Sequence, residues 1–136
     1  MLIRRLTRRP QFLAANAGIR VPMPAFVLLV HPRGDGDDAA GFGITATKKL
    51  GGAVERNRVK RRLRAAVRAT FPDGAIAGAD HVLIGRSDAL TLEYASLASD
   101  LAKALGKAPK RLAERNRGRV PHPRSPASGK GQENSA

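Results

Sequence analysis

The chain has 136 residues, enough for one domain with a modest hydrophobic core. It carries 25 Lys and Arg against 11 Asp and Glu, and the net charge of +14 favours a polyanionic partner over a small metabolite. It has no Cys, which excludes disulfides and thiolate metal sites, and its longest apolar run, residues 25–30, is far too short to span a bilayer. Because the N-terminus also lacks the apolar stretch of a secretory signal, we expect a soluble, cytoplasmic protein with no membrane partner.

The N-terminal part of the chain predicts one short helix. Residues 1–9 are basic and lead into Pro10, a favourable first residue of a helix, while Gly18 is a favourable stop. We therefore expect a helix over about residues 10–17, with Phe12 on a buried or half-buried side.

Two strands are predicted next. Pro22 and Pro24 exclude helix, and the apolar run at residues 25–30 is typical of a buried strand. Large apolar and small residues alternate over residues 40–47, which predicts a second strand, and the two most simply pair as an antiparallel hairpin. The acidic stretch at residues 35–38 is expected to be the hairpin turn, because it lacks the terminal Glu of a calcium-binding loop.

The most informative part of the chain is residues 48–64, called here the basic segment. It holds eight Lys and Arg side chains and one acid, Glu55. Gly51-Gly52 and residues 71–74 interrupt the helical pattern on either side, so we expect a helix over about residues 53–69. At roughly 100° per residue, the apolar side chains of this helix fall on one stripe: Val59, Leu63, Ala66 and Val67. The opposite side is expected to carry Arg58, Lys60, Arg61, Arg64 and Arg68, with Arg56 nearer the apolar edge.

Charge of one sign at this density predicts a nucleic-acid partner, since a solvated helix face would mix Glu and Lys at i, i+4. A polyanion relieves the repulsion, and each neutralised phosphate releases condensed counterions. Arg suits phosphate oxygens, whereas Asn57 suits a base edge, a 2′-hydroxyl or a bound water. Gly51-Gly52 is either a simple turn or a place where the backbone approaches a phosphate. It is not a Walker loop, because the Gly-Lys-Ser/Thr ending is missing.

The C-terminal part predicts a strand, a helix and a tail. A strand is expected at residues 81–85, and a helix over about residues 92–105 with Thr91 as its N-cap. Beyond it, Lys, Arg, Pro, Ser and Gly replace large apolar residues. We therefore expect one domain over residues 1–106 and a disordered basic tail over residues 107–136.

The sequence contains no recognisable catalytic constellation. His31, His81 and His122 lack metal-ligand spacing with another His or a carboxylate, and no Ser lies in a nucleophile elbow. A hydrolytic nuclease usually needs clustered carboxylates to hold metal ions, and the acids here are scattered apart from residues 35–38. We therefore predict no catalytic side chain and a role in binding and positioning.

A longer stretch around the basic segment resembles the signature of the bacterial ribonuclease P protein subunits: Gly43-Ile44-Thr45-Ala46-Thr47-Lys48-Lys49-Leu50-Gly51-Gly52-Ala53-Val54 followed by Arg56-Asn57-Arg58-Val59-Lys60-Arg61. The resemblance covers about residues 3–106 and matches Phe12 to the family's first-helix Phe. It implies an α+β fold, an α-β-β-β-α-β-α two-layer sandwich whose first short strand lies near residues 20–22. It also implies a left-handed β-α-β crossover, where general rules would favour the right-handed form.

The resemblance further implies an RNA-based activity. In this family a large catalytic RNA uses Mg²⁺ to hydrolyse the 5′ leader from precursor tRNA. The protein is then an enzyme subunit, with one protein per RNA and precursor tRNA as a second partner. The implied RNA-binding residues are Lys48, Lys49, Arg56, Asn57, Arg58, Lys60, Arg61, Arg64 and Arg68. The expected leader-binding residues are Phe12, Thr45 and Thr47, with Phe12 stacking on a base.

Two positions depart from the family pattern. The resemblance implies that the leader lies in a cleft between the first helix and the sheet face. Asn16 stands where the family often has a second aromatic residue, and Leu29 where it often has Tyr, so this cleft is poorer in stacking surface. Phe12 is then either the main leader contact or a plain core residue.

Other classes of protein remain open at this point. The charge and size would suit a ribosomal or ribosome-assembly protein equally well. A sequence-specific DNA-binding protein would place the basic helix in a major groove, but no second helix is positioned to form a helix-turn-helix. A self-sufficient protein nuclease would need the carboxylate cluster that the chain lacks.

Overall fold

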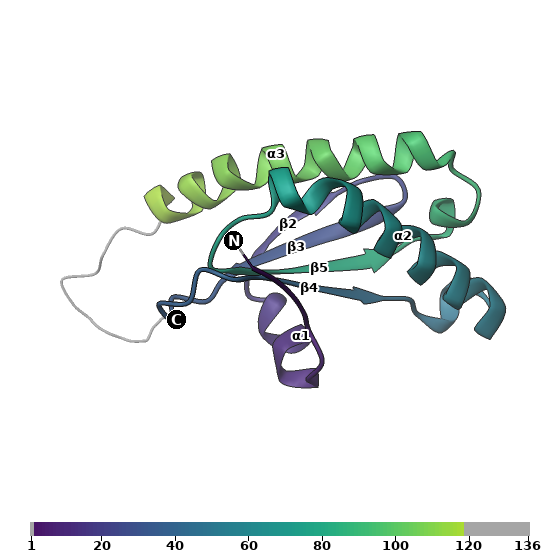
Figure 1. Ribbon diagram of the computed structural model, residues 1–136, viewed down its shortest axis with the longest axis horizontal. Coiled ribbons are helices and arrows are strands. Elements are labelled where there is room, and N and C mark those ends of the chain that lie inside the picture. Colours follow the sequence, from purple (N-terminus) through teal and green to yellow (C-terminus); the bar gives the residue numbers. More distant parts are fainter. Residues whose placement is uncertain (1, 119–136) are drawn as a thin grey trace.

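The computed structural model describes residues 2–118, which fold into one five-stranded sheet with three α-helices packed on it (Figure 1). In chain order the elements are β1 (Ile3–Arg5), α1 (Arg9–Ala15), β2 (Ile19–Pro22), β3 (Phe26–Pro32), β4 (Ala40–Thr45), the 3-10 turn η1 (Lys48–Leu50), α2 (Ala53–Gly74), β5 (Ala79–Gly85), the 3-10 turn η2 (Ser87–Leu90) and α3 (Tyr94–Gly118). The α+β class and the implied α-β-β-β-α-β-α order are confirmed, with β1 as an additional strand at the N-terminus.

The strand order β1-β4-β5-β3-β2 shows that the predicted hairpin of β3 and β4 is wrong. β5 lies between them, antiparallel to β3 and parallel to β4, and the chain crosses from β4 to β5 through α2. The physical reason is that β5 is apolar toward both faces, with Val82 in one buried cluster and Leu83 in the other. A strand that must be covered on both sides takes a central place in the sheet.

Helices cover the two faces of the sheet unequally. α2 and α3 bury the larger cluster, which includes Phe26, Leu28 and the predicted apolar stripe of α2. α1 lies on the opposite side of the sheet from α3 and covers a smaller cluster (Figure 1). The buried members of the smaller cluster are Leu6, Ala15, Val27, Leu29 and Val82, with Phe12 packed against them. Because only one short helix covers this face, part of the surface beside β4 is left open.

α2 extends past its predicted end at residue 69 to Gly74, with Pro72 inside its last turn. The buried ring of Phe71 packs edge-to-face on Phe42 with centroids 6.0 Å apart, which holds this turn in the core. Pro lacks a backbone donor, so only one intrahelical hydrogen bond is lost near the helix end.

α3 begins and ends later than the sequence predicted. The amide of Leu97 donates to the carbonyl of Glu93, so Thr91 is not the N-cap. The helix continues beyond Gly106 to Gly118, with Ala108 buried and Arg111 donating to the Arg20 carbonyl at 2.6 Å. Of the tail predicted over residues 107–136, the first twelve residues are therefore helical, and residues 119–136 lie outside the described part.

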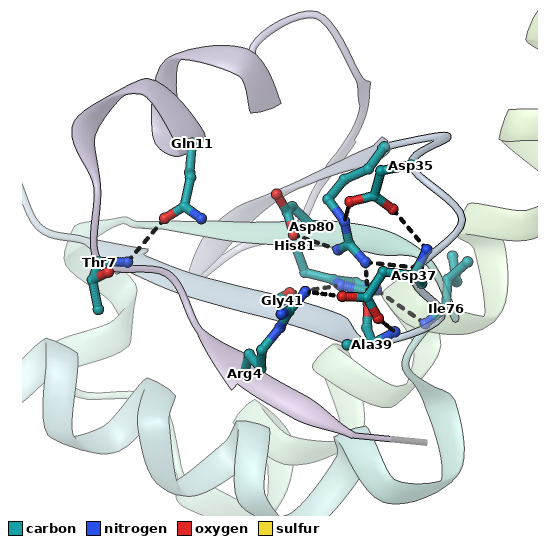
Figure 2. A network of polar contacts seen from close by, with 11 residues as sticks. Arg4, Thr7, Gln11, Asp35, Asp37, Ala39, Gly41, Ile76, Asp80 and His81 are labelled. Atoms are coloured by element: carbon teal, nitrogen blue, oxygen red, sulfur yellow. Dashed lines mark hydrogen bonds and ion pairs between the residues drawn. The ribbon is translucent and has the colours of Figure 1, made fainter.

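A polar network joins the β3–β4 connection to the sheet and to β1. The Arg33 guanidinium binds the nearly buried Asp80 at 2.7 Å and Asp35 at 2.9 Å, and it donates to the Ala39 carbonyl. Arg4 of β1 binds Asp37 at 2.7 Å. Figure 2 shows Arg4 joined to Asp37, a contact that adds to the pairing of the short β1 with β4 at the sheet edge.

Candidate nucleic-acid interface

The start of α2 is fixed by the glycine pair and the single acid of the basic segment. Gly51 has φ 130°, a conformation that side chains disfavour, and the Gly52 amide donates to Glu55 Oε1 at 2.8 Å. This capping carboxylate also suits the positive end of the helix dipole. Since Glu55 already occupies the Gly52 amide, the pair acts as a turn that starts the helix.

The cations of α2 divide into three groups by their direction around the helix. Arg58, Arg61 and Arg68 are exposed, together with Asn57, on the side opposite the apolar stripe. Lys60 and Arg64 are half-buried and turn toward β4. Arg62 turns the other way, donating to the Ala89 carbonyl at 2.8 Å and also to the Leu92 carbonyl. Equal charges in one segment therefore have unequal access to a partner.

The remaining predicted RNA-binding residues lie at the N-terminal end of the same helix. Lys48 and Lys49 are exposed on η1, directly before the turn into α2. Arg56 is half-buried, and its Nε donates to the Gly52 carbonyl at 3.4 Å. The structure thus brings the predicted RNA-binding residues together on η1 and α2, on two of that helix's sides.

A small cleft, called here the edge cleft, opens where β1 ends and β4 continues. It has a volume of about 70 Å³ and is lined by Arg5, Leu6, Phe12, Phe42, Gly43, Ile44, Lys60 and Arg64. Phe12 lies directly against β4, since a Cβ added at Gly43 would be 2.4 Å from its ring. Among the described residues, the buried Nε of Arg64 has no hydrogen-bond partner. The edge cleft therefore combines two aromatic rings, Phe12 and Phe42, with cationic donors.

The predicted leader-binding residues are only partly brought together. Phe12 lines the edge cleft, whereas Thr45, half-buried, and Thr47, exposed, are not among its lining residues. Sequence reasoning missed Arg5 and Leu6, which reach the cleft because β1 pairs with β4. The sequence feature that could have indicated this contact is Leu6, an apolar residue within the basic stretch 1–9.

The acidic connection between β3 and β4 is a structural turn. A hydrogen bond from the Asp37 amide, together with Arg33, lowers the pKa of Asp35. A hydrogen bond from the Ala39 amide, together with Arg4, lowers the pKa of Asp37. Within residues 2–118, no group of three or more His, Cys, Asp or Glu side chains is placed to hold a metal ion. The carboxylates of this turn instead bind arginines and backbone amides.

His81 is a buried structural residue. Its Nε2 accepts a hydrogen bond from the Ile76 amide at 3.1 Å, so Nδ1 carries the proton and donates to the Gly41 carbonyl at 3.0 Å (Figure 2). Burial lowers the pKa of this imidazole below its ordinary value. The neutral ring thereby links β4, β5 and the loop after α2. In the same described range, no helix is long and apolar enough to cross a bilayer.

Comparisons with known proteins give matches over most of the chain. A family model described as ribonuclease P matches residues 3–109. The ribonuclease P protein component of Erythrobacter litoralis is 45% identical over 104 residues, covering 76% of this chain and 84% of that protein. The component from Gluconacetobacter diazotrophicus is 46% identical over 111 residues, covering 81% and 95%. The solved RNase P protein of Thermotoga maritima superposes with a TM-score of 0.63 at 27% identity, covering 74% of this chain and 94% of that one.

Proposed function

The chain belongs to the ribonuclease P protein family, and from that membership we propose that it binds the catalytic RNA and the 5′ leader of precursor tRNA, assisting endonucleolytic removal of the leader. In this role it is a subunit of a ribonuclease holoenzyme and takes part in tRNA processing within a ribonucleoprotein. We further expect one protein per RNA and a cytoplasmic location.

The observation that carries the proposal is the exposed cationic face of α2. Arg58, Arg61 and Arg68 project from a helix whose other side is anchored in the core by Val59 and Leu63. A rigid row of guanidinium groups is suited to phosphate oxygens, which they can bind bidentately. The partner proposed for this row is the catalytic RNA.

The edge cleft is the proposed contact for the leader. A single strand leaving the exposed face of α2 would pass Lys60 and Arg64 and meet the ring of Phe12. Asn16 is exposed just after α1, and Leu29 is buried beneath α1, so neither offers an aromatic surface there. The other aromatic residue of the cleft, Phe42, packs edge-to-face on Phe71, so Phe12 is the residue proposed to stack on a leader base.

The chemistry is assigned to the RNA, with Mg²⁺ held on the RNA. Asp35, Asp37 and Asp80 are engaged by Arg33 and Arg4, and His81 uses both ring nitrogens in the fold. These groups are thus committed to structural contacts. The chain's own contribution is to bind both RNAs and to orient the leader.

Reconstitution with the cognate catalytic RNA tests this function. Protein and RNA together are expected to cleave precursor tRNA at the 5′ end of the mature sequence at low magnesium, whereas the protein without RNA should cleave nothing. Turnover by RNA-free protein would contradict the assignment of chemistry to the RNA. A protein that binds ribosomal RNA tightly but does not stimulate the catalytic RNA would instead identify a ribosome-assembly protein.

A further inference from the structure

An open hollow lies between the first turn of α2 and η2. Its volume is about 280 Å³, and it is lined by Val54, Glu55, Arg58, Leu90 and Thr91. Val54 is 77% exposed, the largest exposed fraction of any large hydrophobic side chain in residues 2–118. We call this feature the Val54 hollow.

The walls of the Val54 hollow are held in place by contacts within the protein. Arg62 ties η2 to α2 through the carbonyls of Ala89 and Leu92. Leu90, between them, is half-buried and packs against the larger core cluster. On the other side, Glu55 is fixed by its hydrogen bond from the Gly52 amide. Two walls of the hollow, η2 and the first turn of α2, are therefore held in place by the fold.

The position of the hollow connects it to the exposed arginines. Val54, Arg58 and Arg61 are spaced i, i+4 and i+7, so they share one side of the helix. An RNA strand whose phosphates lie on Arg58 and Arg61 passes over Val54 at the N-terminal end of α2. A single exposed apolar side chain is ordinary, but this one forms one wall of a concavity with Arg58 at its rim.

We propose that the Val54 hollow receives one unstacked nucleobase of the RNA bound along α2. Val54 and Leu90 offer apolar contact to the faces of the base, and the planar guanidinium of Arg58 can stack on it while remaining near the phosphate. Arg58 could bind a phosphate, but the apolar Val54 and Leu90 and the carboxylate of Glu55 could not, so the ligand that suits the hollow as a whole is a base. This inference rests on the proposed function, because it assumes that RNA occupies the arginine side of α2.

The test uses the full chain with the cognate catalytic RNA and compares Val54→Ala with the charge variant Arg58→Gln/Arg61→Gln. Val54→Ala should weaken binding about tenfold, since it removes the methyl groups that the base would cover, and the salt dependence should stay unchanged. One nucleotide of the RNA, protected from base-specific chemical modification by the wild-type protein, should regain reactivity. The melting temperature of the free protein should not fall, because Val54 makes little contact in the fold.

Two further variants separate a base site from general affinity. Val54→Lys adds a cation beside Arg58, so pure electrostatics predicts tighter binding, whereas a filled hollow predicts weaker binding. Leu2→Ala removes another exposed apolar side chain, 63% exposed, and should bind like wild type.

Tighter binding by Val54→Lys, an equal loss in Leu2→Ala, or wild-type affinity and protection in Val54→Ala would each overturn the inference. If Arg58→Gln/Arg61→Gln still weakens binding in those cases, RNA binding along α2 stands and only the base site in the Val54 hollow fails. If that variant also binds like wild type, the proposed RNA binding and the base site both fail.

Discussion

Arg58, Arg61 and Arg62 lie within two turns of one helix, yet the first two face solvent and the third is tied to backbone carbonyls on the neighbouring connection. The charge density of the basic segment is the same for all three residues. Their direction around α2 determines whether a guanidinium group can reach a phosphate or must support the fold. A count of cations therefore overstates how many of them are exposed to a partner.

The largest effect is expected from the exposed side. Arg58→Gln/Arg61→Gln should weaken binding to the catalytic RNA by about 3 kcal/mol, since each guanidinium–phosphate contact contributes about 1.5 kcal/mol or more. The log-log salt slope should flatten by roughly 1.4 to 1.8, at 0.7 to 0.9 per lost phosphate contact. Filter binding across a salt series measures both quantities. Lys103→Gln/Lys107→Gln removes the same charge from exposed positions on α3 and is the matched control. An unchanged slope in the α2 variant would mean that these arginines face solvent in the complex.

Replacing Arg62 should lower the stability of the protein and leave the salt dependence of RNA binding unchanged. Arg62→Met leaves the Ala89 and Leu92 carbonyls without their donor, so the free energy of unfolding should fall by about 2 kcal/mol. The salt slope of RNA binding should hardly change, because no phosphate contact is lost. Urea unfolding of the free protein measures the first quantity. Arg68→Met, exposed on the same helix, should change stability by less than about 0.5 kcal/mol. A flattened slope in Arg62→Met with unchanged stability would reverse the roles assigned to the two sides.

Sequence periodicity was sufficient to locate this helix and its buried stripe. Val59, Leu63, Ala66 and Val67 are all buried as predicted, because a 3.6-residue period is a local property of the chain. The role of Arg62 could not be predicted, since its acceptors lie 27 and 30 residues away. The same limit applies to strand pairing. The predicted hairpin paired two strands that are neighbours in the sequence. β5 lies between them because both of its faces are apolar and must be buried.

The ends of the helices show a second limit of sequence reasoning. Pro72 and Gly106 are ordinary stop signals, but Phe71 and Ala108 are buried beside them, and this tertiary burial outweighs the local preference. Of the residues predicted to bind the leader, Phe12 lines the edge cleft, whereas Thr45 and Thr47 do not. Arg5 was missed because a three-residue strand has no readable period.

A substitution of Phe12 tests the other side of α2, which faces the edge cleft. Phe12→Ala should weaken precursor tRNA binding to the holoenzyme by about 1–3 kcal/mol, the contribution of one stacked base, and leave mature tRNA binding nearly unchanged. Leu13→Ala is the matched control, because Leu13 is the next residue on α1, 53% exposed and outside the edge cleft. Affinities for both tRNAs, measured beside a melting curve, decide the role. Parallel losses of the two affinities with a lower melting temperature would make Phe12 a core residue only.

The smallest effect concerns His81, which lies outside both sides of α2 proposed to face RNA and should affect stability alone. Because burial lowers its pKa in the folded state, the unfolded chain binds the proton more readily. The stabilising contribution of the neutral ring is therefore fully present above the unfolded value of about 6.5 and is lost as pH falls below it, at no more than about 1.4 kcal/mol per pH unit. Protonation would also remove the acceptor for the Ile76 amide. Urea unfolding between pH 7.5 and pH 5 measures the slope. His31→Gln should keep the slope and His81→Gln should abolish it, whereas an equal slope in both variants would assign the titration to another group.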